Sequence, residues 1–124
     1  MHAPRIEVDD DSAPLPLRIT ECMRLLNLAV EESKKRGKAM VEAEAAYYSA
    51  KAHEAFKLLE DGYAVTFIQS VIKGRPGVSD AMSDYHAAEV EYKNAVEAVN
   101  VYKLKLRVLE ADYEREWEQI RRSE

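Results

Sequence analysis

Glycine and proline are scarce in this sequence, whose 124 residues contain four of each. Tight turns favour these two residues, and a sandwich or barrel with many hairpins needs turns at short intervals. The shortage excludes such an architecture and predicts a few long elements. Hydrophobic residues make up 47% and charged residues 33% of the chain. This balance is typical of amphipathic helices and too apolar for a fully disordered chain.

Cysteine is nearly absent, and long apolar runs are missing. The single cysteine, Cys22, cannot form an internal disulfide. We find no charged-then-apolar leader and no run of about 18 apolar residues, the length that a membrane-spanning helix requires. We therefore expect a cytoplasmic protein without a membrane partner.

Motifs that carry catalysis are absent as well. The stretch from Gly74 to Gly77 lacks the lysine and serine that end a phosphate-binding loop, and it is interpreted as a turn. His53 and His86 do not have the spacing at which helices present metal ligands. The sequence thus predicts no enzyme, no cofactor, no metal site and no small-molecule substrate.

The chain length allows one domain, preceded by a short arm. Residues 1–18 hold three prolines and the acidic run from Asp9 to Asp11, without helical periodicity. We predict a mobile arm over residues 1–18, whose acidic run either improves solubility or mimics nucleic-acid phosphates, and a helical domain over residues 19–124.

One long helix, or two helices in line, is predicted from an N-cap at Thr20 to a stop at Gly62. Apolar residues recur three or four positions apart along it. The pattern lapses between Ser33 and Lys38, where Gly37 indicates either a bend or a close helix crossing. The residues of the predicted stripe are Ile19, Met23, Leu26, Val30, Val41, Ala45, Tyr48, Ala52, Ala55 and Leu59.

A short helix is predicted between Gly62 and Gly77. Phe67, Ile68, Val71 and Ile72 form a compact apolar face that is too hydrophobic to remain in water. We expect all four to be buried at the end of a helical hairpin or against another subunit.

The second long helix shows the clearest pattern and is predicted to start with Ser79 as its cap. Its apolar residues form a coiled-coil heptad, which we call the seam: Tyr85, Tyr92, Val99, Leu106, Tyr113 and Ile120, with Ala88, Ala95, Tyr102 and Leu109. Small residues near the start and bulky ones near the end predict a seam that opens toward the chain termini. There Trp117 would anchor an interface. The predicted oligomer interface comprises Tyr92, Val99, Leu106, Leu109, Tyr113, Trp117 and Ile120.

Two long helices joined by a short connection are expected to pack antiparallel. The predicted fold is therefore all-α, a long antiparallel helical hairpin or coiled coil with a short helix at its tip, completed as a homo-oligomer. A loop centred near Ser70 would pair Tyr48 with Tyr92 and Val41 with Val99. The same pairing predicts one basic belt formed by Lys34, Lys35, Arg36, Lys38, Lys103, Lys105 and Arg107.

This belt has two interpretations. It is either a solvated face that meets acidic neighbours or a site for a polyanion. If single-stranded DNA binds there, the cations would hold phosphates while the Tyr102 ring stacks on a base. Otherwise Tyr102 is a seam residue. The net charge of −5 argues against a surface that coats nucleic acid generally.

The stretch from Val41 to Trp117 resembles a known family. The segments that carry the resemblance are EAAYYSAKAHEAF, KGRPGVSD, YHAAEVEYKNAVEA and YKLKLRVLEADYEREW. It resembles small helical proteins of bacteriophage early regions, some of them similar to the UvsY class of recombination mediators. The resemblance implies an oligomeric protein that binds single-stranded DNA and helps a recombinase or annealase displace a single-strand-binding protein, in the host cytoplasm.

The leading functional hypothesis is accordingly a non-enzymatic phage-type accessory protein in recombination or replication. One alternative is a protein-binding inhibitor or adaptor, such as an anti-defence or host-takeover factor, whose acidic surface meets a basic groove. Another alternative is a coiled-coil structural component.

Overall fold

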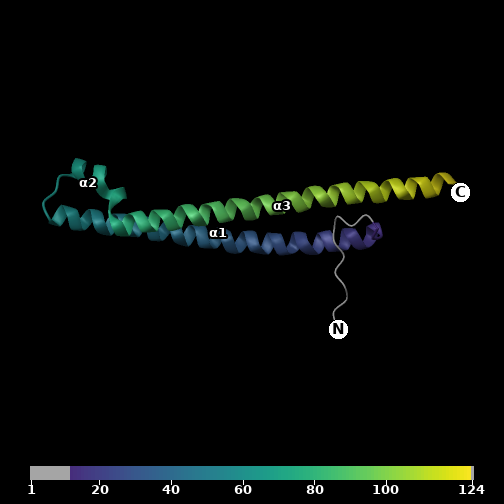
Figure 1. Cartoon of the computed structure of the whole chain (residues 1–124), viewed down its shortest axis with the longest axis horizontal. Coiled ribbons are helices and arrows are strands. Elements are labelled where there is room, and N and C mark those ends of the chain that lie inside the picture. Colours follow the sequence, from purple (N-terminus) through teal and green to yellow (C-terminus); the bar gives the residue numbers. More distant parts are fainter. Residues whose placement is uncertain (1–11, 124) are drawn as a thin grey trace, which may run out of the picture. The chain divides into compact units, whose positions relative to one another are not determined.

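The described part of the chain is all-helical. A computed structural model describes residues 12–123, and these contain helices and no strand (Figure 1). The elements are α1 (Leu15–Glu60), α2 (Val65–Val71), the 3₁₀ helix η1 (Ile72–Gly74) and α3 (Pro76–Ser123). This confirms the predicted fold class and the packing of one long helix against another. The acidic run of the predicted arm lies outside the described residues.

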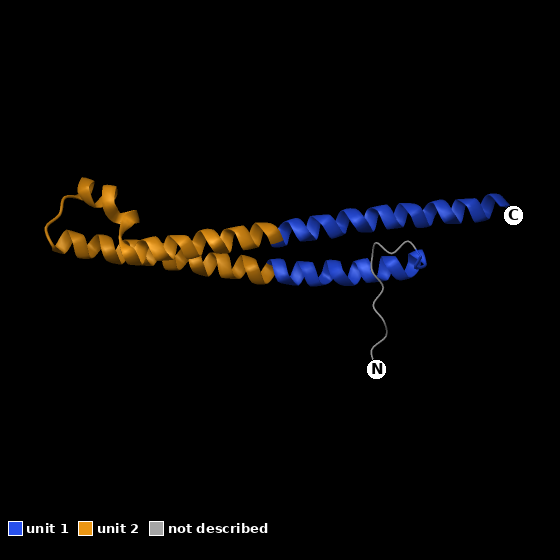
Figure 2. Ribbon diagram, in the orientation of Figure 1, with its two compact units in different colours: residues 1–33, 95–124 blue, residues 34–94 orange. Residues whose placement is uncertain are grey.

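The chain divides into two compact units (Figure 2). The first unit combines the start of α1, up to residue 33, with α3 from residue 95 onward. The second unit comprises residues 34–94, which include α2 and η1. In each unit a part of α1 packs against a part of α3.

The start of α1 lies earlier than predicted. The helix begins at Leu15, and the N–H groups of Leu17 and Arg18 both donate to the Pro14 carbonyl at 3.1 Å. Pro16 is tolerated because the first turn of a helix leaves its N–H groups without helical acceptors anyway. Thr20 is not an N-cap: its hydroxyl donates to the Pro16 carbonyl at 3.0 Å within the helix. Residues 15–18 therefore belong to the helix and not to the arm.

The predicted stop at Gly62 is confirmed. α1 ends at Glu60, and Gly62 has a φ of +91°, a conformation that costs glycine nothing. The Tyr63 N–H donates to the Leu58 carbonyl at 3.2 Å, and the Gly62 N–H donates to the Leu59 carbonyl at 3.0 Å. This pair of bonds is a Schellman motif, which satisfies the last carbonyls of the helix and turns the chain.

The connection between the long helices, residues 61–75, is called the tip. Its helix α2 confirms the predicted short helix, and Ile68 and Ile72 are buried with Leu58 and Val78 in one cluster. Val71 packs against this cluster. Phe67 was predicted to be buried and is instead 46% exposed. A short helix can bury only one face, and Ile68 and Ile72 occupy it.

The second long helix begins at Pro76, before the predicted cap Ser79. The Ser79 N–H donates to the Arg75 carbonyl at 2.8 Å, so Ser79 is already inside the first turn. Proline suits this first position because its fixed φ is helical and it has no N–H to satisfy.

The register between α1 and α3 in the second unit differs from the prediction. Tyr92 lies against Gly37 and not against Tyr48, while Tyr47 is buried and stacks on Tyr85 with ring centroids 6.1 Å apart. Val41 is exposed. The predicted pairs Tyr48 with Tyr92 and Val41 with Val99 are therefore wrong.

The reason is the position of the chain reversal. Arg75 bonds to Glu54, so α3 already starts alongside α1 at the end of η1. The tip folds back on the helices, which moves the centre of the reversal from Ser70 to about Ala64. The predicted apolar stripe of α1 is confirmed at Ile19 and Ala55, which pack against the buried clusters. It is out of phase at Tyr48 and Leu59, which are exposed while their neighbours Tyr47 and Leu58 are buried.

In the first unit, Cys22 and Leu109 form the core. Cys22 is fully buried and Leu109 is 3% exposed. Leu15, Ile19 and Leu25 of α1 and Tyr102 and Leu106 of α3 pack around the pair. The Cys22 thiol donates to the Tyr102 carbonyl at 3.5 Å. Cys22 is thus a core residue, which agrees with its interpretation as a small packing residue.

Gly37 marks a close approach of the two helices and not a bend. A methyl group at this position would come within 3.0 Å of Cε2 of Tyr92. Replacing a helical glycine by alanine normally gains about 1 kcal/mol. We expect Gly37→Ala to lose this gain because the Tyr92 ring must move, and to recover it in a Tyr92→Ala background. A double-mutant cycle by chemical denaturation measures this coupling; additive effects would contradict the register.

Candidate interaction surfaces

The tip exposes an unusual amount of apolar surface. Within residues 56–67, five large apolar side chains are between 46% and 67% exposed. The Tyr63 and Phe67 rings contact each other, and a group of exposed apolar side chains of this kind marks a site where another molecule binds. We call this set the tip surface: Phe56, Leu59, Tyr63, Val65 and Phe67.

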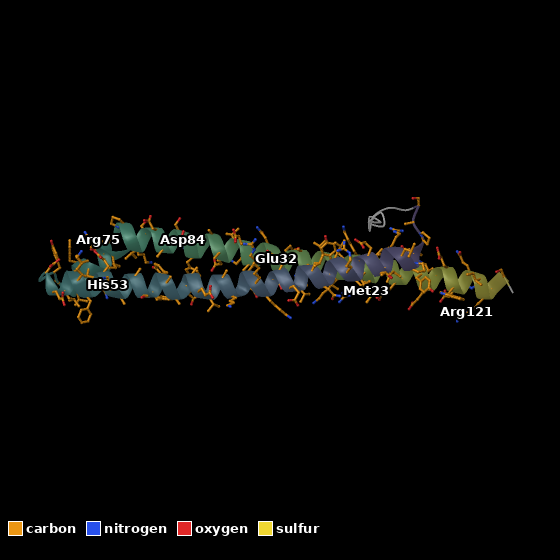
Figure 3. All side chains as sticks on the ribbon, turned by 90° about the horizontal axis from the view of Figure 1, so that it is seen from below. Met23, Glu32, His53, Arg75, Asp84 and Arg121 are labelled. Carbon is orange, nitrogen blue, oxygen red and sulfur yellow. The ribbon has the colours of Figure 1, made fainter. Side chains whose placement is uncertain are left out.

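A ring stack and an ion pair fix residues in and next to the tip surface. The Tyr63 and Phe67 rings stack with centroids 5.1 Å apart and an interplanar angle of 21°. Arg75, at the start of α3, donates to the Glu54 carboxylate of α1 at 2.8 Å, and the Glu54 side chain is only 18% exposed. Figure 3 labels Arg75 and, on α1, His53. His53 and Phe56 line a shallow hollow together with Lys57. The stacked Tyr63 and Phe67 rings therefore already support each other before any partner arrives.

The aromatic residues below the tip are structural. Tyr47 is 7% exposed and packs on Tyr85, and the Tyr85 hydroxyl interacts with Glu44. The hydrogen bond to the Glu44 carboxylate, together with burial, raises the pKa of Tyr85, because both disfavour the phenolate. These rings fill the space between the helices and do not offer faces to a ligand.

The predicted basic belt depended on the wrong register. Arg36 donates to the Glu91 carboxylate at 2.7 Å, so the cluster Lys34, Lys35, Arg36 and Lys38 lies beside Glu91 within the second unit. Lys103, Lys105 and Arg107 belong to the first unit. Acidic residues also lie near the first cluster on α1, since Glu31 and Glu32 stand three and two residues before Lys34. The register on which the belt was predicted is therefore not the one observed in the second unit, and the belt stays a prediction.

Tyr102 has a different environment from the one that base stacking requires. Its ring is half-buried in the cluster around Cys22 and Leu109. The Lys105 ammonium lies 5.8 Å from the ring centroid, a cation–π distance. Packing in the cluster and the contact with Lys105 thus already cover much of the Tyr102 ring. A role of Tyr102 in binding nucleic acid stays a prediction.

The residues of the predicted oligomer interface fall into two groups. Tyr92 lies against Gly37, Val99 is 8% exposed, and Leu106 and Leu109 belong to the cluster around Cys22. For Tyr92, Leu106 and Leu109, α1 of the same chain provides the contact.

The second group lies further along α3. Trp117 and Ile120 are 47% and 48% exposed, and Tyr113 is half-buried. The Tyr113 and Trp117 rings meet edge to face, with centroids 6.2 Å apart. Only this end of the predicted interface still offers large exposed side chains.

Sequence reasoning missed four members of the tip surface. Phe67 had been noticed, but as a buried residue, and Leu59 had been assigned to the stripe that faces α3. One signal was available for Phe56 and Leu59: they lie two positions before and one position after Leu58, and a helix cannot turn all three toward one neighbour. Tyr63 and Val65 gave no such signal, because only the fold of the tip decides their exposure.

Metal binding and membrane insertion find no support in residues 12–123. No group of His, Cys, Asp and Glu side chains in this stretch is arranged to hold a metal ion. None of its helices combines the length and the apolar character that crossing a membrane requires.

Comparisons with known proteins returned no match among family models, curated proteins or solved structures. The resemblance to bacteriophage recombination mediators therefore stays an expectation from the sequence.

Proposed function

We propose that this chain is a non-enzymatic protein-binding adaptor or inhibitor that engages its partner through the tip surface. The observation that carries the proposal is the exposure of Tyr63 and Phe67, whose rings stack on each other next to the buried Ile68. Aromatic side chains that stay ordered in water lose little conformational entropy on binding, and they dominate binding energy in protein interfaces.

The charges beside the tip surface indicate the kind of partner. Glu60 and Asp61 lie between Leu59 and Tyr63 and are exposed. These carboxylates repel phosphates, whereas they complement a groove with a basic rim. The tip surface therefore fits an apolar groove of a protein with cations at its edge better than it fits a nucleic acid.

Binding of single-stranded DNA, which the resemblance implies, remains the second candidate. Lys103 and Arg107 are exposed and share one side of α3. Glu110 and Glu114 continue the same line of the helix three and seven residues further on, so cations and carboxylates share this face. This pattern weakens the attraction for phosphates, and it favours the protein-binding proposal.

Photo-crosslinking tests the proposal. A benzophenone side chain in place of Phe67 is expected to trap one discrete protein in extracts of the source cells. The same probe in place of Asp84, an exposed residue of α3 labelled in Figure 3, is the matched control and is expected to trap none. Excess unaltered protein is expected to compete, and the variant Phe56→Ser/Phe67→Ser is not.

The comparison between the unaltered protein and the variant as competitors decides whether the tip surface binds the trapped protein. Equal competition by the variant and by the unaltered protein, at unchanged helix content, would contradict a role of the tip surface. In parallel, fluorescence anisotropy with a single-stranded oligonucleotide at about 50 mM salt tests the second candidate. Binding that weakens steeply as salt rises, and that Lys103→Glu/Arg107→Glu abolishes, would favour nucleic acid over protein as the partner.

A further inference from the structure

The seam of α3 continues beyond the residues that α1 covers. Leu15, the first residue of α1, already belongs to the cluster around Cys22 and Leu109. Figure 2 shows that in the first unit α3 extends past this first turn of α1. Tyr113, Trp117 and Ile120 follow Leu109 at helical spacing on the same side of α3. We call residues 113–123 the open segment.

The described residues leave this segment uncovered. Trp117 and Ile120 are about half exposed although they continue a face that is buried at Leu109. Between the first turn of α1 and α3 lies a hollow, lined by Pro14, Arg18 and Glu116 among others. Tryptophan is enriched among the residues that dominate binding energy in interfaces.

We propose that the open segment pairs with the open segment of a second copy of this chain, in the antiparallel direction. A two-fold arrangement brings Trp117 of one protomer against the partner's Ile120, and Ile120 against the partner's Trp117. Such an interface is isologous: both protomers contribute the same surface, so each contact between residues occurs twice.

Charge complementarity supports this pairing. Glu114 and Arg121 are seven residues apart, so they lie on the same flank of the apolar face, and both are exposed. When Trp117 meets the partner's Ile120 in the antiparallel direction, Glu114 lies beside the partner's Arg121, and Arg121 lies beside the partner's Glu114. Two opposite-charge pairs therefore form on this flank.

Steric exclusion decides the direction. In the first unit α1 packs on the seam face of α3 at Leu106 and Leu109, and its first turn shares a hollow with Asp112 and Glu116. A second α3 that lay parallel on the open segment would continue into the space that α1 occupies. An antiparallel helix leads away from α1 instead. The structure therefore selects the antiparallel mode, although a parallel one would also offer an ion pair, from Glu116 to the partner's Arg121.

Sedimentation velocity over a range of concentrations tests the proposal. The unaltered protein is expected to show a reversible monomer–dimer equilibrium, and Trp117→Ala is expected to weaken it about a hundredfold, since both copies lose an anchor. Trp117 is the one tryptophan of the sequence. Its fluorescence is therefore expected to shift to the blue in parallel with the increase in mass.

A charge swap tests the direction. Glu114→Arg alone places two cations side by side, and Arg121→Glu alone places two carboxylates side by side, so each is expected to weaken the dimer about tenfold. The double variant Glu114→Arg/Arg121→Glu is expected to restore it. In a parallel dimer Glu114→Arg would have little effect and the double variant would not recover.

Three outcomes would overturn the proposal. They are a monomer at all concentrations with Trp117 emission that is independent of concentration, an association that Trp117→Ala leaves intact, and a double charge variant that dissociates like the single ones. The first would show that a second copy of this chain does not cover Trp117. Helix content by circular dichroism serves as the folding control for every variant.

Discussion

Ile68→Asp is expected to unfold the tip. Ile68 is 5% exposed and packs with Tyr47, Leu58, Ile72 and Val78. A carboxylate at this position has no partner in the cluster, and burying an unpaired charge costs several kcal/mol. The tip is short and is held mainly by this cluster, so it can open while the pairing of α1 and α3 around Gly37 persists.

Hydrogen exchange measures this effect. Amides of residues 65–74 are expected to lose their protection in Ile68→Asp, whereas amides near Tyr92 keep theirs. Gln69→Asp is the matched control, because Gln69 is the next residue of α2 and is exposed. Equal protection of the tip in both variants would show that Ile68 does not hold it.

Leu109→Ala is expected to destabilise the first unit by about 2–5 kcal/mol. Leu109 is 3% exposed and packs against the fully buried Cys22, so alanine leaves a cavity in a small core. The cause is a loss of packing within one chain. Since α1 provides the contact, this loss is expected even at concentrations where the protein is a monomer.

Denaturant unfolding at low protein concentration measures the loss. Val108→Ala is the control: Val108 is the neighbouring residue, is 53% exposed, and is expected to change stability by no more than about 0.5 kcal/mol. A change below about 1 kcal/mol for Leu109→Ala would mean that the core around Cys22 is less well packed than the structure shows.

The contrast between Leu109 and Trp117 separates folding from association. Both residues lie on one apolar face of α3, and the sequence pattern alone does not distinguish a buried position from an exposed one on that face. α1 covers the first and leaves the second half exposed. Substitutions at Leu109 are therefore expected to change the free energy of unfolding of one chain, and substitutions at Trp117 the equilibrium between copies.

The candidate surfaces were predictable to different degrees. Trp117 was recognisable from its place at the open end of a heptad. The tip surface was not, because the exposure of Tyr63 and Val65 depends on how α2 folds back on the long helices. The two basic clusters were visible in the sequence, but their predicted union depended on a register that the observed bond between Arg36 and Glu91 contradicts.

The sequence by itself determined the helices and the inward face of α3. Scarce glycine and proline excluded a fold of many short elements, the heptad from Tyr85 to Tyr113 defined the buried side of α3, and Gly62 ended α1. These features follow from the sequence because periodicity and turn chemistry are local properties of the chain. Only the tertiary structure decided the register and the phase of α1. Those depend on long-range contacts, namely the folded-back tip, the bond between Glu54 and Arg75, and the approach of Tyr92 to Gly37.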